Sequence, residues 1–177
     1  MRAFERFEKD GQSRRGGILA IDYGRARLGL AIADAQVGLP RPLATLERIN
    51  RNEDMRRLRR IVREQDIREV VVGLPLRLDG TRGEMAEEAA RLAARVRKQL
   101  GVPVEMVDER LTSWEAQRLL EEQVGRIGHK RSKRPGKRKE PLEIQTVDTI
   151  AAALILQEYL RRRAKDTEQV KATGGVR

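Results

Sequence analysis

The chain has 177 residues, with 38 basic against 27 acidic side chains and a net charge of +11 at pH 7. This length suffices for one domain with a full hydrophobic core and is too short for two large lobes. The absence of cysteine excludes disulfides, thiolate zinc sites and cysteine nucleophiles. The excess of positive charge favours polyanionic partners, with nucleic acid as the first candidate.

Both ends of the chain are polar and contain glycine pairs. We therefore expect a flexible N-terminal tail at residues 1–17, a folded domain at 18–160, and a flexible basic C-terminal tail at 161–177. The N-terminus lacks the apolar stretch of a signal peptide, and no later segment has the long uncharged run of a membrane span. The expectation is a cytoplasmic protein with no membrane partner.

The folded part opens with short apolar runs that are typical of strands. Residues 18–22 and 28–33 are separated by a loop that contains glycine, which predicts two neighbouring antiparallel strands. A third strand is expected near residues 42–46.

Helices and strands then alternate along the chain. The predicted order is a helix at 54–65, a strand at 69–73, a helix at 83–100 and a strand at 103–107. Gly101 is expected to terminate the helix at 83–100. Strands that are connected through helices run parallel. The sheet should therefore be mixed, with an antiparallel meander followed by a parallel section.

A basic loop separates two further predicted helices, which cover residues 113–124 and 143–160. The loop spans residues 125–142 and carries Lys130, Arg131, Lys133, Arg134, Lys137, Arg138 and Lys139. This density suits contacts with phosphates rather than with bases, and the alternative is a solvated loop that has no partner. The single histidine, His129, lies in the same loop, which argues against a zinc site.

Acidic residues occur at positions where α/β sheets bind ligands. Asp22 closes the first strand, and Asp108 and Glu109 end the strand at 103–107. Strand side chains alternate between faces, so only one of Asp108 and Glu109 should face Asp22, and the spacing does not choose between them. The simpler interpretations are a turn cap for Asp22 and an ion pair with Arg110 for the other two.

Asp148 is unusual because its neighbours at plus three, plus four and plus seven in the last helix are apolar. An acid beside an apolar face should bind a cation or act as a charge at the helix N-terminus. With Asp22 and one strand-end acid, it would form an oxygen-rich site suited to one or two Mg²⁺ or Mn²⁺ ions. Arg25, Arg27 and Arg110, with the basic loop, are the candidate nucleic-acid contacts.

Blocks of sequence that occur in a fixed order carry a family resemblance. They are ILAIDYGRARLGLAIAD at 18–34, VVGLPLRLDG at 71–80, VDERLTSWEA at 107–116, and VDTIAAALILQEYL at 147–160. They resemble the YqgF family, also called RuvX, a branch of the ribonuclease H-like superfamily related to Holliday junction resolvases. The resemblance implies a ribonuclease H-like α/β fold, with a five-stranded mixed sheet flanked by helices. It also implies that Asp22, Glu109 and Asp148 are the catalytic and metal-binding acids.

The same resemblance implies a metal-dependent nuclease that processes the 5′ end of pre-16S ribosomal RNA. We expect structured or single-stranded RNA as the partner, with DNA as an alternative, and a monomer or a homodimer. A Holliday junction resolvase, which needs two active sites, and a noncatalytic RNA-binding ribosome-assembly factor remain alternatives. An actin-like or sugar-kinase ATPase is disfavoured by the chain length and by the lack of a P-loop.

Overall fold

The computed structural model describes residues 16–35, 38–111 and 146–173. Its elements in chain order are β1 (Gly17–Tyr23), β2 (Arg27–Asp34), β3 (Arg41–Glu47), α1 (Arg51–Glu64), β4 (Ile67–Leu74), α2 (Glu84–Leu100), β5 (Val104–Asp108), the 3-10 helix η1 (Glu109–Leu111) and α4 (Val147–Thr173). Every strand that the sequence predicts is present. The first four extend a little beyond their predicted bounds, and β5 is shifted by one residue from the predicted 103–107.

The strands form one five-stranded sheet in the order β3-β2-β1-β4-β5. Within it, β1 pairs antiparallel with β2, and β2 pairs antiparallel with β3. The pairs β1–β4 and β4–β5 are parallel. The five-stranded mixed sheet is therefore confirmed, with the meander and the parallel section in the predicted order.

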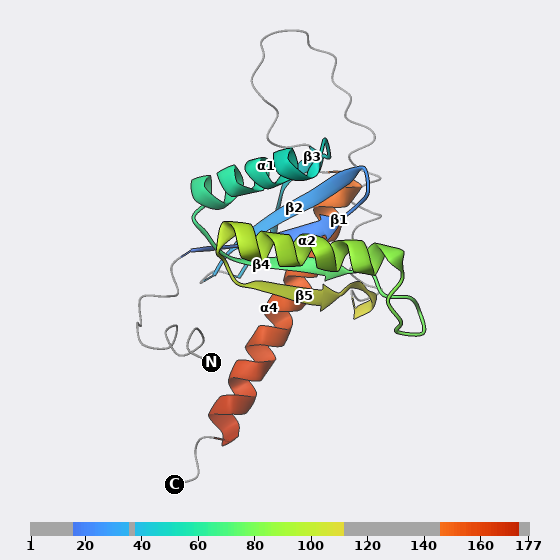
Figure 1. Cartoon of the computed structure of the whole chain (residues 1–177). Helices are drawn as coiled ribbons and strands as arrows, with labels where there is room; N and C mark the ends of the chain where they lie inside the picture. Colours follow the sequence, from blue (N-terminus) through green and yellow to red (C-terminus); the bar gives the residue numbers. More distant parts are fainter. Residues whose placement is uncertain (1–15, 36–37, 112–145, 174–177) are drawn as a thin grey trace, which may run out of the picture.

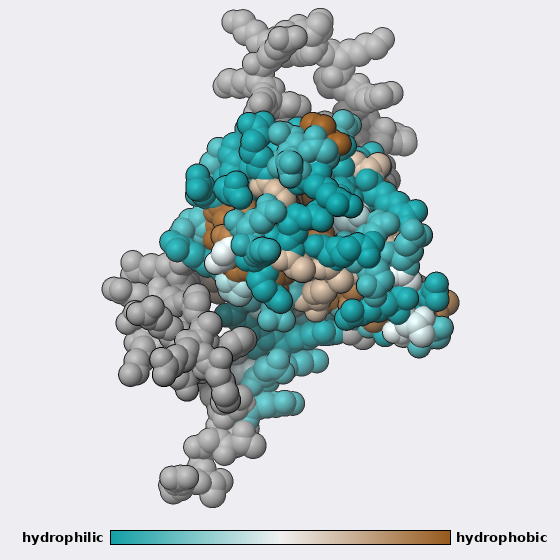
Figure 2. All heavy atoms as spheres, in the orientation of Figure 1, coloured by the Kyte–Doolittle hydropathy of each residue, from teal (hydrophilic) through white to brown (hydrophobic). Residues whose placement is uncertain are grey.

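Helices cover both faces of the sheet (Figure 1). Leu19 and Ile21 of β1 point into the hydrophobic cluster beneath α1 and α2. Ile18 and Ala20 point into the cluster beneath α4. Because side chains alternate along a strand, Asp22 faces the α4 side, at the end of β1. The opposite side, over α1 and α2, is largely hydrophilic at its surface (Figure 2).

The helix ends follow local capping rules. Helix α1 begins at Arg51, earlier than the predicted start at Asp54, because the side chain of Asn50 accepts hydrogen bonds from the backbone of Asn52 and Glu53. Helix α2 ends as predicted at Gly101, which adopts the left-handed conformation with φ of 70°.

Helix α4 is longer than the sequence predicts. The helix was expected to end at Leu160, with a flexible tail from residue 161, but it continues to Thr173. The added turns are rich in strong helix formers such as Arg, Lys, Ala and Gln. The buried Glu158 also pairs with Arg161 and Arg162, one turn further along. Figure 1 shows this end of α4 extending away from the sheet.

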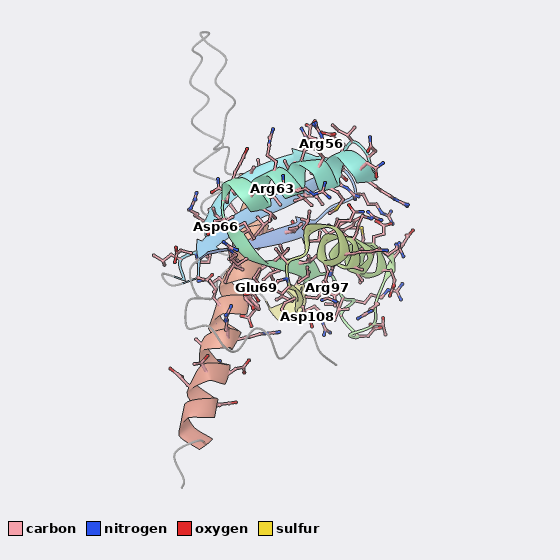
Figure 3. All side chains as sticks on the ribbon, turned by 60° about the vertical axis from the view of Figure 1, so that its left-hand side comes forward. Arg56, Arg63, Asp66, Glu69, Arg97 and Asp108 are labelled. Carbon is pink, nitrogen blue, oxygen red and sulfur yellow. The ribbon has the colours of Figure 1, made fainter. Side chains whose placement is uncertain are left out.

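A polar contact joins the middle of α4 to β4 of the sheet. Glu69 of β4 accepts hydrogen bonds from the Tyr159 hydroxyl and from Arg163 Nη1, the latter at 2.7 Å (Figure 3). Burial and the neighbouring carboxylate raise the pKa of Tyr159, so the hydroxyl keeps its proton for this bond.

Some predicted segments lie outside the described residues. They are the N-terminal residues 1–15, the predicted helix at 113–124, and the basic loop at 125–142 with His129. In the described part of the chain, none of the helices has the length and apolar character needed to span a membrane.

Candidate active site

Asp22 lies at the end of β1, directly opposite Gly29 in the β1–β2 ladder. A Cβ at Gly29 would lie 2.0 Å from the backbone oxygen of Asp148, so only glycine allows the first turn of α4 to approach β2 this closely. The structure thereby brings together Asp22, from the start of the chain, and Asp148, from its end.

The first turn of α4 is fixed by a reciprocal cap. The backbone N–H of Thr149 donates to the Thr146 hydroxyl, and the backbone N–H of Thr146 donates to the Thr149 hydroxyl. The Thr146 hydroxyl also lies 2.6 Å from the Thr45 hydroxyl of β3. Asp148 therefore stands in a rigid first turn, where the positive end of the helix dipole favours an acid.

Glu109 follows the end of β5 and packs across the neighbouring strand. A Cβ at Gly73 of β4 would lie 2.2 Å from Glu109 Oε1 and 2.7 Å from the Cδ1 atom of Ile155 in α4. The Glu109 carboxylate thus occupies the space between the sheet and α4, on the same face as Asp22.

Asp108 has a different role. Its carboxylate pairs with Arg110 Nη2 at 2.7 Å and accepts a hydrogen bond from the Arg110 backbone, at the end of β5 (Figure 3). This contact holds the pKa of Asp108 below its ordinary value. Of the two neighbouring acids, Glu109 is the one that lies with Asp22.

The pKa values of Asp22 and Glu109 report their shared environment. Burial raises the pKa of Asp22 from 3.8 to about 6, with a further contribution from the charge of Asp148. Burial raises the pKa of Glu109 from 4.5 to about 7, and the charges of Asp22 and Asp108 add to the rise. Acids crowded into a low-dielectric region in this way are typical of functional sites.

The donor chemistry fits a hard divalent cation, which would relieve the repulsion among these carboxylates. Among the described residues, however, no three acidic, histidine or cysteine side chains already stand in position around one metal ion. Arg27 Nε lies 3.1 Å from Asp148 Oδ2 and neutralises that carboxylate. This contact uses Oδ2 of Asp148, and the second carboxylate oxygen of Asp148 is the atom left to join the other two acids.

The arginines singled out from the sequence lie in different places. Arg25 pairs with Glu84 at 2.7 Å and with Glu88 at 3.1 Å, both in α2. Arg27 pairs with Asp148, and Arg110 pairs with Asp108. The remaining basic candidates lie outside the described residues: Lys130, Arg131, Lys133, Arg134, Lys137, Arg138 and Lys139.

A polar network on the opposite face, which was not predicted from the sequence, supports the turn that follows Asp22. Arg48 Nη1 donates to the Tyr23 hydroxyl at 2.7 Å and to the Gly24 carbonyl at 3.2 Å. Arg48 Nε pairs with Asp54 at 3.0 Å, and Asp54 is only 4% exposed. The available signal was Asp54 itself, an acid one turn before the apolar Leu58 in α1, which needs a buried cationic partner.

Comparison with known proteins identifies close relatives. The family model RuvX, described as Holliday junction resolvase, matches residues 16–162. A protein of Koribacter versatilis named "Putative pre-16S rRNA nuclease" is 42% identical over 154 residues, which cover 87% of this chain and 92% of the relative. A protein of Thermosynechococcus vestitus with the same name is 38% identical over 157 residues, which cover 89% and 95%.

Solved structures with a similar outline are more distant. RuvC of T. thermophilus in complex with a Holliday junction substrate is 18% identical, with a TM-score of 0.49 and coverage of 84% of this chain and 96% of that one. The Fowlpox virus resolvase in complex with Holliday junction DNA is 13% identical, with a TM-score of 0.47 and coverage of 83% and 98%.

Proposed function

The chain belongs to the RuvX family, and from that premise we propose that it is a nuclease whose divalent ions are held by Asp22, Glu109 and Asp148. The observation that carries the proposal is the pair of partly buried acids, Asp22 and Glu109, whose pKa values are raised by burial and by neighbouring carboxylates. Such a cluster destabilises the fold unless a cation offsets it, so a functional role accounts for its presence.

The chain's own residues suit phosphodiester hydrolysis. One or two Mg²⁺ or Mn²⁺ ions at these carboxylates would supply an activated water and charge stabilisation for the leaving oxygen. Asp22 is positioned by β1, and Glu109 is positioned by its close approach to Gly73. Together they would hold the bound ions, and hence the activated water, in a fixed place. Arg27 is 59% exposed, so its guanidinium can turn from Asp148 to a substrate phosphate.

We propose RNA as the substrate, specifically the 5′ end of pre-16S ribosomal RNA. The names of the relatives that match nearly the whole chain support this choice. The net charge of +11 supports a polyanionic substrate of either kind. The description of the family supports one alternative, a Holliday junction resolvase that acts in DNA recombination and repair.

The experiment compares cleavage of a labelled pre-16S 5′-end RNA and of a synthetic four-way DNA junction, with Mg²⁺ or Mn²⁺. Wild type is tested beside Asp22→Asn and a matched control, Asp166→Asn, which alters an exposed acid in the outer part of α4. We expect wild type and the control to cut the RNA, and Asp22→Asn to bind it without cutting.

Other outcomes decide against parts of the proposal. Paired symmetric cuts in the junction, without cleavage of the RNA, would establish the resolvase function instead. Binding of the RNA without cleavage under any metal condition would point to a noncatalytic assembly factor. Cleavage that survives Asp22→Asn would remove Asp22 from the metal site.

A second readout does not depend on activity. A ligand that binds only the folded state raises the unfolding temperature. Mn²⁺ should therefore raise the unfolding temperature of wild type and of Asp166→Asn, and should raise that of Asp22→Asn much less. An equal rise in all three proteins would argue against metal binding by Asp22.

A further inference from the structure

The loop between β4 and α2, residues 75–83, lies beside the candidate active site. It starts where Leu74 at the end of β4 pairs with Asp108 at the end of β5, the residue before Glu109. Figure 1 shows the loop projecting from the molecule next to η1. Any strand that reaches the carboxylates from this side therefore passes the loop.

The loop is clamped to the segment that carries Glu109. Arg110 Nη1 donates to the carbonyl oxygens of Arg77 and Leu78, at 3.3 Å each, while Arg110 Nη2 holds Asp108 at 2.7 Å. Gly80 adopts a φ of +85°, and a Cβ there would lie 3.4 Å from Arg110 Nη1. One guanidinium thus fixes the position of the loop relative to the site.

The loop also has internal structure. The Asp79 carboxylate accepts hydrogen bonds from the backbone N–H of Thr81 at 2.8 Å and from its hydroxyl at 2.7 Å. Leu76 and Arg82 form an antiparallel bridge across the base of the loop. The side chain at the tip is therefore presented in a defined place.

Leu78 at this tip is 97% exposed. Single exposed apolar side chains are common on protein surfaces, and Leu39, which is 72% exposed, is another in this chain. Leu78 differs because its backbone is bonded to the active-site segment and because the neighbouring Arg77 and Arg82 are exposed cations. An apolar tip on a loop that also carries exposed arginines matches the chemistry of a nucleotide, which has an apolar base face and an anionic phosphate.

We infer that Leu78 packs against an unpaired nucleobase of the strand that enters the site, while Arg77 and Arg82 contact its phosphates. This inference rests on the proposed nuclease function and adds a substrate preference to it. In a duplex, both faces of each base are covered by stacking, so an apolar side chain reaches a base face only where the stack is opened. The loop would thus select strands with unpaired bases near the scissile bond.

The test measures binding in EDTA, so that it does not depend on cleavage. The ligands are a single-stranded RNA oligonucleotide that carries 2-aminopurine and the same RNA as a full duplex. The variants are Leu78→Ala and the matched control Leu39→Ala. Leu39 follows the end of β2, and this end pairs with the start of β1. Leu39 therefore comes after the end of the β1–β2 pair that is opposite to Asp22.

We expect Leu78→Ala to weaken binding of the single strand by roughly tenfold, the effect of losing one buried leucine contact. Its binding of the duplex should not change, and the 2-aminopurine fluorescence change seen with wild type should be reduced. Leu39→Ala should behave as wild type. Both variants should unfold at the wild-type temperature because both side chains are exposed.

The inference is overturned if Leu78→Ala binds the single strand as wild type does, if duplex binding falls equally, or if wild type does not bind the single strand. Cleavage with Mn²⁺ is measured separately. A protein that binds the single strand through Leu78 but never cuts it would refute the nuclease function and leave the base contact standing. A protein that cuts the RNA but whose binding is unaffected by Leu78→Ala would support the nuclease function and refute the base contact.

Discussion

The carboxylate of Glu109 lies in the space that a side chain at Gly73 would fill, with Oε1 2.2 Å from the position of a Cβ at that residue. Gly73 lies in β4 and Glu109 begins η1 directly after β5, so the two meet only because β4 and β5 are parallel neighbours in the sheet. Gly73 is not one of the described glycines that have a positive φ. The requirement for glycine at this position is therefore one of space rather than of backbone conformation. Gly73 is therefore part of the site.

Replacing Gly73 with alanine should displace Glu109 and abolish metal-dependent cleavage. The added Cβ would also meet Ile155 at 2.7 Å, so we expect a loss of stability of about 1 to 3 kcal/mol from overpacking. Cleavage is compared with that of Glu109→Gln, and folding is followed by urea unfolding. Wild-type cleavage in the alanine variant would show that the position of Glu109 is not critical.

The stability of the protein without divalent ions should fall as the pH rises from about 4 to about 8. The pKa of Glu109 rises from 4.5 to about 7 on folding, so the folded state binds this proton more tightly than the unfolded chain does. The resulting stabilisation is fully present below pH 4.5 and is lost as the pH rises through about 7. Asp22 acts in the same direction, with loss through about pH 6.

Since one pKa unit corresponds to about 1.4 kcal/mol, Glu109 alone contributes on the order of 3 kcal/mol to this change. Glu109→Gln should therefore flatten the pH dependence and should be more stable than wild type at pH 8 in EDTA. Urea unfolding at pH 5 and pH 8 measures both effects. An identical pH dependence in the two proteins would contradict the assigned environment of Glu109.

Arg48→Met should destabilise the protein strongly because it leaves the carboxylate of Asp54, which is 4% exposed, without its cation. Breaking a buried pair from one side costs about 3 to 5 kcal/mol. The matched control is Arg56→Met, because Arg56 pairs with Glu53 at a similar distance of 2.8 Å but is 76% exposed. That change should cost less than about 1 kcal/mol. Equal losses in the two variants would show that the Arg48 network does not support the fold.

The effect of Leu78→Ala on single-strand binding should shrink when Arg110 is also replaced by alanine. Without the bonds from Arg110 to the carbonyl oxygens of Arg77 and Leu78, the tip of the loop is no longer held beside the site. A double-mutant cycle of binding free energies should give a coupling of at least about 0.5 kcal/mol. Additive effects would mean that Arg110 does not position the loop. Leu39→Ala in the same background supplies the reference for no coupling.

Much of the fold was predictable because it is encoded locally. The apolar runs at 18–22 and 28–33, the helical spacing in 54–65, and Gly101 at the end of α2 each follow from neighbours in the chain. The length of α4 differs from the prediction, because the charged residues after Leu160 favour a flexible tail when only the sequence is considered. Their helix propensity and the pairs of Glu158 with Arg161 and Arg162 extend the helix instead.

The sequence by itself determined the order of elements and the family resemblance, and through that resemblance it predicted the three acidic positions, Asp22, Glu109 and Asp148. Only the tertiary structure decided which atoms meet: Asp148 over Gly29, Glu109 over Gly73, Arg27 on Asp148, and Arg110 on the loop that carries Leu78. The reason is physical. Local pattern depends on residues a few positions apart, whereas burial, charge repulsion and steric fit depend on segments that become neighbours only when the sheet and α4 pack together.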